Sequence, residues 1–238
     1  MNILEAYIKQ HKQLIILILG LPCTNKSEIA KELQIDLNLP LMKINDYLDR
    51  TKIKEINVDN YTFKVYGDVE FYNYEKLNED VNSKKTDGVI LYGNNIDGDK
   101  INFLPDFVFF YSMGSTLCKK ILIEKNMMKI KGDEPINVYF EKIFNPMYEE
   151  LKKKIKINKF FNIKETMTFD NVYDETFDLL MELVSKKLKQ QTQSRHYSKY
   201  PKYSKYSKHS KQSRQSRQSR QSRQSRQSRQ SKQSRQSK

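Results

Sequence analysis

Residues 14–33, LIILILGLPCTNKSEIAKEL, decide the fold of this chain. The first six are all aliphatic, a pattern typical of a β-strand that is buried on both faces. Gly20 ends this run, and a short loop leads to Lys26 and Ser27. Apolar residues then recur at the spacing of one helix face: Ile29, Ala30, Leu33 and Leu37. The stretch therefore predicts a strand, a glycine turn and a helix.

The loop matches the phosphate-binding pattern G-x-x-x-x-G-K-[ST] with one exception, since Asn25 stands where the second glycine is expected. Asparagine tolerates a left-handed backbone better than other non-glycine residues, so the turn can survive. In such a loop, Lys26 reaches the outer phosphates and the Ser27 hydroxyl reaches Mg²⁺. The alternative is an ordinary strand-to-helix turn, but motif and context together favour a nucleotide site. Its predicted residues are Gly20, Leu21, Pro22, Cys23, Thr24, Asn25, Lys26 and Ser27.

Further apolar runs predict an α/β fold of the P-loop NTPase type, with a parallel sheet and helices on both faces. Residues 53–66 read as a hairpin with Asp59 and Asn60 at the turn, and Pro146 is expected to kink a long helix. The predicted strands are residues 14–19, 41–44, 88–92, 105–111 and 160–163. The predicted helices are residues 2–12, 26–37, 74–82, 115–126, 137–155 and 173–188.

The positive charge is concentrated in the C-terminal segment. The 238 residues include 43 basic and 29 acidic ones, a formal net charge of +14. Residues 191–238 hold 15 of the basic residues and no acid, which leaves 28 basic against 29 acidic residues in the rest. The segment repeats Tyr-Ser-Lys and then Gln-Ser-Arg units and lacks aliphatic side chains, so it cannot form a core. We predict a folded domain over residues 1–190 and a disordered tail over residues 191–238.

The tail is suited to bind RNA or DNA without sequence preference, because its cations neutralise phosphates and its tyrosines offer stacking surfaces. The alternative is a repeat that expanded without a selected role, and the sequence leaves both open. No sequence feature indicates the oligomeric state.

Two cysteines, Cys23 and Cys118, do not make a disulfide framework, and no signal peptide is recognised, so a reducing cytoplasmic location is expected. Residues 14–19 are too short to cross a bilayer, and no membrane contact is expected. Cys23 lies near a predicted helix start, which would lower its pKa. The richness in Lys, Asn, Ile and Tyr suggests an AT-rich genome, such as that of a large DNA virus or of some protists, and a viral source would place the protein in the host cytoplasm or virion.

The order of motifs over about residues 12–190 resembles the uridine kinase branch of P-loop kinases, which includes phosphoribulokinase-like enzymes. Residues 20–27 stand where this family has its Walker A loop. The other similar segments are residues 44–47 (INDY), 68–77 (DVEFYNYEKL), 105–110 (PDFVFF), 115–124 at the lid helix, and 139–151 (YFEKIFNPMYEEL). The resemblance implies transfer of the γ-phosphate of ATP, with Mg²⁺, to the 5′-hydroxyl of a pyrimidine nucleoside such as uridine.

The chain departs from the family at functional positions. Tyr92 and Gly93 replace a Glu-Gly pair, and lysines replace the lid arginines at Lys119 and Lys120, with Lys125 nearby. Lysine supplies a positive charge to a phosphate, but unlike arginine it cannot form two parallel hydrogen bonds to it. These departures motivate a competing hypothesis, in which a P-loop scaffold without catalytic activity binds nucleotide and the tail tethers it to nucleic acid.

Asp46 follows a predicted strand at the sheet edge where α/β proteins bind ligands. The resemblance implies that Asp46 takes the proton from the acceptor hydroxyl and, with Ser27, lies near Mg²⁺. A residue that caps the following turn is the alternative. The resemblance likewise points to Asp68 as a substrate-binding residue.

Tyr47 and Tyr72 are candidates for stacking on a base, although most aromatic residues of such a chain belong to the core. Lys119 and Lys120 are candidates for closing over ATP, and a solvated helix face is the alternative for both.

Overall fold

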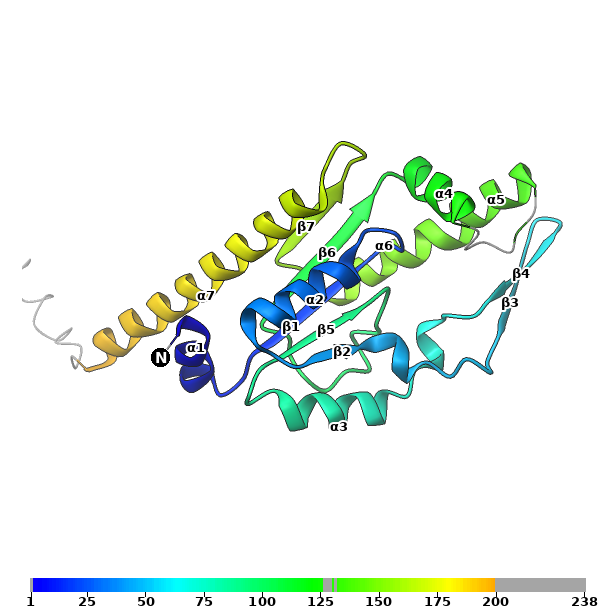
Figure 1. Cartoon of the computed structure of the whole chain (residues 1–238). Helices are drawn as coiled ribbons and strands as arrows, with labels where there is room; N and C mark the ends of the chain where they lie inside the picture. The colour runs from blue at the N-terminus through cyan, green and yellow to red at the C-terminus, as the bar shows by residue number, and fades with distance from the viewer. Residues whose placement is uncertain (1, 126–129, 131, 200–238) are drawn as a thin grey trace, which may run out of the picture. The chain divides into compact units, whose positions relative to one another are not determined.

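The computed structural model describes residues 2–125, 130 and 132–199, with side chains up to residue 190 (Figure 1). The chain divides into two units, Met1–Leu188 and Lys189–Lys238. All strands of the described part belong to the first unit. In the residues described, no helix is both long enough and apolar enough to span a membrane.

A five-stranded sheet lies at the centre of the first unit, in the order β2-β5-β1-β6-β7. Its strands are β1 (Ile15–Gly20), β2 (Leu41–Lys43), β5 (Val89–Gly93), β6 (Phe107–Met113) and β7 (Lys159–Ile163). Every neighbouring pair is parallel, and Leu17 of the central strand stands opposite Leu91 on one side and Val108 on the other. Numbered within the sheet alone, the strand order is 2-3-1-4-5.

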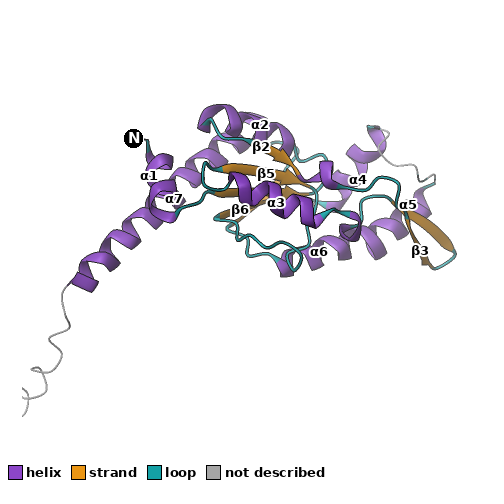
Figure 2. Cartoon of the chain, turned by 90° about the horizontal axis from the view of Figure 1, so that it is seen from below, coloured by secondary structure: helices purple, strands orange, loops and turns teal. Residues whose placement is uncertain are grey.

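The helices cover both faces of this sheet, as predicted. They are α1 (Ile3–His11), α2 (Lys26–Leu37), α3 (Tyr74–Lys84), α4 (Ser115–Glu124), α5 (Asp133–Tyr139), α6 (Asn145–Lys154) and α7 (Phe169–Lys199). Side chains from α3, α4, α5 and α6 form one apolar cluster, and side chains from α1, α2 and α7 form the other (Figures 1 and 2). The α/β fold class is therefore confirmed.

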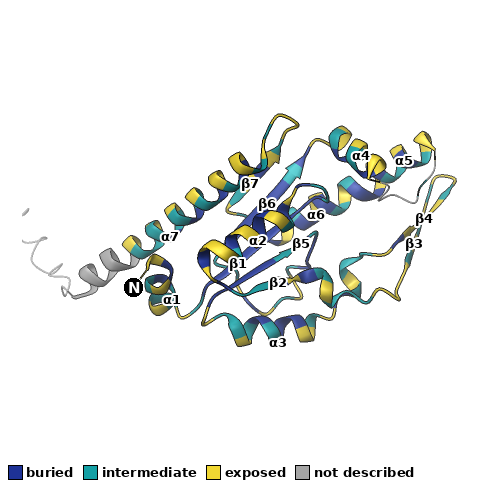
Figure 3. Cartoon of the chain, viewed as in Figure 1, coloured by how far each residue is buried: buried dark blue, intermediate teal, exposed yellow. Residues whose placement is uncertain are grey.

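Strand β1 contributes to both clusters because its side chains alternate across the sheet. Ile15, Leu17 and Leu19 pack in the first cluster, and Ile16 and Ile18 pack in the second. All are fully buried (Figure 3). Each such side chain contributes roughly 1.5–3 kcal/mol to the stability of the fold.

A separate antiparallel hairpin consists of β3 (Lys54–Val58) and β4 (Tyr61–Val65), with Asp59 in a left-handed conformation at the turn. This confirms the predicted hairpin. Phe63 and Val65 of β4 form a small apolar cluster with Ile143, which follows α5. The hairpin is thus packed against the helical segment that precedes α6.

The predicted long helix over residues 137–155 starts earlier and is interrupted. Its path begins at α5, passes through a π-helical turn at Phe140–Phe144 and continues as α6. Pro146 lies at the start of α6. Proline lacks an N–H and clashes with the carbonyl four residues earlier, so the wider π turn accommodates it without ending the helix.

The final helix was predicted over residues 173–188, but α7 runs from Phe169 to Lys199. Helix α7 therefore includes residues 191–199, and the predicted boundary between a folded domain and a disordered tail at residue 190 stays a prediction. An amphipathic helix can continue beyond its last core contact where no proline or glycine stops it, and the first proline comes at Pro201. The rest of the predicted tail, residues 200–238, lies outside the described residues.

Gly20 is the position where the fold depends most directly on a missing side chain. Its φ is +149°, and a β-carbon there would stand 2.0 Å from the Tyr111 carbonyl oxygen of β6. The neighbouring Leu21 N–H donates to that same oxygen at 2.8 Å. The turn out of β1 thus lies directly against the backbone of β6.

We expect Gly20→Ala to lower the free energy of unfolding by at least about 2 kcal/mol, because both the backbone strain and the clash must be relieved. Urea denaturation measures this. Gly67→Ala is the matched control, since a β-carbon at Gly67 meets nothing within 4 Å. Equal stability of the Gly20 variant and the control would contradict this view of the turn.

Candidate nucleotide-binding site

The loop between β1 and α2 turns through two left-handed residues, Cys23 at φ 65° and Asn25 at φ 55°. The sequence-based view of Asn25 is therefore confirmed. Its side chain caps nothing, but its carbonyl accepts from the N–H groups of Glu28 and Ile29 at 3.1 and 3.0 Å. Helix α2 begins directly afterwards at Lys26, so its N-terminus lies at the loop, where an anion is favoured.

The carbonyl of Leu21 holds the loop together from inside. It accepts from the Thr24 hydroxyl at 2.8 Å and from the Lys26 ammonium at 2.9 Å. Both side chains are buried. Lys26 is thereby held beside the loop backbone.

Burial lowers the pKa of Lys26 to about 8, because the charged form loses hydration. The nearby Cys23 and Glu28 oppose this shift only in part. Burial also raises the pKa of Cys23, despite the positive charges of Lys125 and Lys26. The expected lowering of the Cys23 pKa is therefore wrong, since desolvation outweighs the effect of the helix start and the two lysines.

A cavity of about 400 Å³, here called the loop cavity, opens beside Lys26 and Ser27 at the carboxyl ends of β1, β2 and β5. This is the edge where parallel α/β sheets bind ligands. Lys31 and Lys43 also line it, so three lysines border one space. Among the described residues that line it there is no Asp or Glu. The remaining lining residues are Pro22, Cys23, Asn45, Tyr92, Gly93 and Asn94.

A second cavity of about 370 Å³, here called the aromatic cavity, adjoins the loop cavity. The two share Pro22, Asn45 and Asn94 as lining residues. The second is lined mainly by rings and amides, and its cation is Lys64 of the hairpin. Its aromatic residues are Tyr66, Tyr72, Tyr139, Phe144 and Tyr148.

Tyr72 joins the strand ends that separate the two cavities. Its buried hydroxyl donates to Asn95 Oδ1 at 3.0 Å and lies 3.3 Å from Asn45 Oδ1. The Asn95 amide in turn donates to the Gly67 carbonyl at 3.1 Å. Of the predicted substrate-binding residues, Tyr72 is the one that lines the aromatic cavity.

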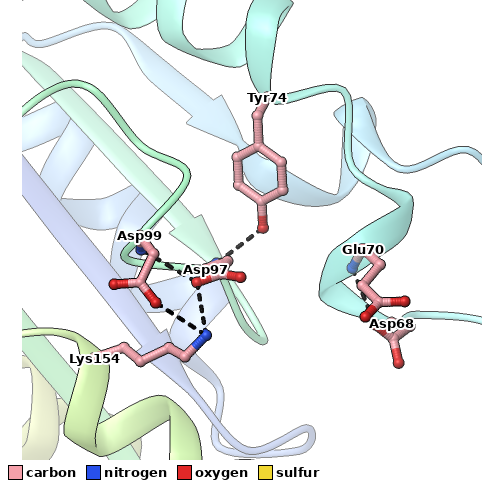
Figure 4. A network of polar contacts seen from close by, with 6 residues as sticks. All are labelled: Asp68, Glu70, Tyr74, Asp97, Asp99 and Lys154. Atoms are coloured by element: carbon pink, nitrogen blue, oxygen red, sulfur yellow. Dashed lines mark hydrogen bonds and ion pairs between the residues drawn. The ribbon is translucent and has the colours of Figure 1, made fainter.

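An ion-pair network fixes the end of α6 (Figure 4). Tyr148 of the same helix lines the aromatic cavity. Lys154, at the end of α6, lies 3.0 Å from Asp97 and 3.2 Å from Asp99. The Asp97 N–H donates to the Tyr74 hydroxyl at 2.8 Å. Burial alone would raise the pKa of Asp97, but the hydrogen bonds from Lys154 and the Asp99 N–H lower it. The network ties α6 to the loop after β5 and to α3.

Asp46 and Tyr47 lie in a 3₁₀ turn, Ile44–Tyr47, directly after β2. They line a third cavity together with Tyr72 and Asp80, not the loop cavity. The Tyr47 hydroxyl donates to Asp80 at 2.7 Å, and burial and this bond raise the pKa of Tyr47. The structure therefore brings Asn45, and not its neighbour Asp46, into the space beside Lys26 and Ser27.

Asp68 caps a short 3₁₀ turn by accepting from the Glu70 N–H at 3.0 Å (Figure 4). Its carboxylate also lies 3.0 Å from the ammonium of Lys54 on the hairpin. Asp68 lines neither the loop cavity nor the aromatic cavity. Asp68 therefore links the hairpin to the 3₁₀ turn that follows it.

The two lid lysines of α4 point to neighbours on the protein surface. Lys119 donates to the Asn137 side chain of α5, and Lys120 lies 3.3 Å from Glu165 with both side chains exposed. Neither lines the loop cavity. Lys125, just after α4, is closer to the loop, because its charge acts on the pKa of Cys23.

The residues present do not fit a Mg²⁺ ion held by the protein. Ser27 offers a hydroxyl, but that hydroxyl donates to Glu28 at 2.9 Å. In the part of the chain that the structure describes, no three His, Cys, Asp or Glu side chains come together at a metal-binding distance. Mg²⁺ prefers carboxylate oxygens alongside phosphates, and the loop cavity lacks them.

The sequence reading missed Lys31, Lys43 and Asn45 as residues of the loop cavity. A signal for Lys31 was present, because it follows Ser27 by four residues and so lies on the same helix face. Lys43 is the last residue of β2, and strand ends face the ligand edge of the sheet.

No protein-family model matches the chain, and no curated protein matches it. Solved structures with a similar arrangement include shikimate kinase from Bacteroides thetaiotaomicron (12% identity, 73% of this chain and 99% of that chain, TM-score 0.43). Another is a gluconokinase from Sinorhizobium meliloti 1021 (6% identity, 76% of this chain and 97% of that chain, TM-score 0.43). A third is the YorR protein of Bacillus subtilis in complex with phosphorylated GDP (15% identity, 70% of this chain and 95% of that chain, TM-score 0.43). Likeness at this level leaves the activity of this chain open.

The lowered pKa of Lys26 predicts that ATP binding weakens as the pH rises. The ammonium attracts phosphate below about pH 8, and this attraction is lost as the pH rises through the pKa. A bound phosphate raises that pKa, so the loss is centred somewhat above 8. Calorimetry in one mixed buffer is expected to show about a tenfold fall in affinity between about pH 7 and 9.

Lys26→Arg is the control, because arginine keeps its charge throughout this range. Its ATP affinity is expected to stay nearly constant with pH. A fall of equal size in the variant would contradict the assignment of the pH dependence to Lys26.

Proposed function

We propose that this chain is an ATP-dependent phosphotransferase for a small molecule, similar in action to a uridine kinase. The observation that supports it is the pair of adjoining cavities that share Pro22, Asn45 and Asn94. One has the phosphate-loop lysine and a helix N-terminus, and the other has rings and amides. A donor phosphate in the first and a flat acceptor in the second would meet at the shared wall.

On this proposal, the loop N–H groups and Lys26 hold the outer phosphates of ATP. Phosphoryl transfer depends chiefly on positioning and on neutralising charge, and these residues supply both. The acceptor would be a pyrimidine nucleoside, with its base among the rings beside Tyr72 and its 5′-hydroxyl near Asn45. Amide side chains of the kind found at Asn94 and Asn95 suit the polar edges of a base.

Asp46 is proposed to take the proton of the acceptor hydroxyl. It adjoins Asn45 in the chain, and its charge, after burial, contributes to the raised pKa of Tyr92, which lines the loop cavity. A catalytic side chain often reaches its position only when substrate is bound. The resemblance also assigns roles to Tyr47, Asp68, Lys119 and Lys120, and these roles remain proposals. In the structure, each of the four side chains contacts another residue of the chain.

A second candidate function is nucleotide binding without transfer. The specific observation that favours it is that no Asp or Glu is found among the described residues that line the two adjoining cavities. Lys119 is half-buried and bonded to Asn137, Lys120 is exposed, and neither lines the two cavities, which is consistent with it.

An ADP-release assay over a panel of nucleosides and other small acceptors tests the main proposal. We expect turnover with at least one pyrimidine nucleoside, and a fall in kcat/KM of about a hundredfold or more in Lys26→Ala. Lys9→Gln, an exposed lysine on α1, is the charge control and should retain the activity. Folded protein that binds ATP but releases no ADP with any acceptor would reject the main proposal in favour of the second.

The basic tail is proposed to bind nucleic acid through its phosphates. Removal of residues 191–238 is expected to abolish such binding and to leave the fold intact, because none of the segment's side chains is suited to the core. A salt titration of single-strand binding by both forms tests this. Equal binding by the two forms would contradict it.

A further inference from the structure

The loop cavity has an unusual balance of charge. Lys26, Lys31 and Lys43 line it, and no carboxylate is found among its described lining residues. Lys26 is buried, whereas Lys31 and Lys43 are exposed. In the described part of the chain, neither of the two exposed lysines forms an ion pair or a side-chain hydrogen bond. Two surface ammonium groups are thus available at the place where a phosphate chain would lie.

The nearest acidic side chains do not change this balance. Glu28 accepts from the Ser27 hydroxyl at 2.9 Å and lies outside the cavity lining. Asp46 lines a different cavity, although its charge extends to Tyr92. A divalent cation in the loop cavity would meet three lysines and no carboxylate among the described lining residues, because the charges of Glu28 and Asp46 reach Tyr92 only from outside the lining.

A nucleotide polyphosphate normally depends on Mg²⁺ to neutralise part of its charge, because the protein supplies only one or two cations. Lysine is a strong point charge for phosphate, and a hydrogen bond between charged partners is stronger than a neutral one. Lys31 follows Lys26 along one helix, and Lys43 ends the neighbouring strand β2, so the three lysines come from two elements that border the cavity. They are placed to supply the neutralisation that Mg²⁺ otherwise gives.

We propose that the loop cavity binds the polyphosphate of a nucleotide without a divalent metal, and that Lys31 and Lys43 make this possible. The inference rests on the proposed nucleotide site, but it concerns binding and not transfer. A nucleotide brought in with its own Mg²⁺ would bind no better than the free nucleotide, since the lysines compete with the metal for the same phosphate oxygens.

The test is calorimetry of ATP with the full chain, once in EDTA and once in excess Mg²⁺. Equal or tighter binding in EDTA is expected. In EDTA, the double variant Lys31→Gln with Lys43→Gln is expected to lose about tenfold or more in affinity, and excess Mg²⁺ should restore part of it. Lys9→Gln is the matched control, since it removes one exposed lysine of α1 that lines none of the cavities described here.

The calorimetry distinguishes failure of this inference from failure of the proposed function. Tight binding in Mg²⁺ with little or none in EDTA overturns this inference and leaves the proposed phosphotransferase standing. Binding in EDTA that the double variant retains in full overturns the role of the two lysines. Failure to bind ATP in either condition, by protein whose thermal unfolding shows it to be folded, overturns both the inference and the proposed function.

Discussion

The two backbone groups of Leu21 connect the sheet to the candidate chemistry. Its N–H donates to Tyr111 of β6, and its carbonyl accepts from Lys26 and Thr24. The first bond requires the chain to leave β1 against the backbone of β6, which only Gly20 permits. The second holds a lysine in the interior, where burial lowers its pKa. The position and the charge of Lys26 therefore both depend on how closely β1 and β6 pack.

The two adjoining cavities depend on a second close approach, between the strand ends of β2 and β5. A β-carbon at Gly93 would stand 2.9 Å from Ile44, so the glycine lets the 3₁₀ turn after β2 come near. That approach places Asn45 within reach of Tyr72 and at the wall that the cavities share.

The two proposed functions, nucleotide binding alone and phosphoryl transfer, require different polar side chains in the cavities. Lysines and amides suit an anion and a flat polar molecule, whereas general-base catalysis and metal binding usually require carboxylates. Asp46 is one residue away from the shared wall, and Asp68 and Asp80 are held by Lys54 and Tyr47.

The sequence by itself determined the fold class, the turn between β1 and α2 and the left-handed Asn25, because these depend on local patterns: a fully apolar strand, a glycine turn and helical spacing. It also predicted the hairpin with its turn at Asp59. It did not determine the π turn before Pro146 or the direction of the Cys23 pKa, because each depends on packing from elsewhere. Only the tertiary structure decided that Asn45 and not Asp46 faces Lys26, and that Lys31 and Lys43 join it. Which of two neighbouring side chains enters a cavity is set by how strand ends from distant parts of the chain meet, and no local pattern encodes that meeting.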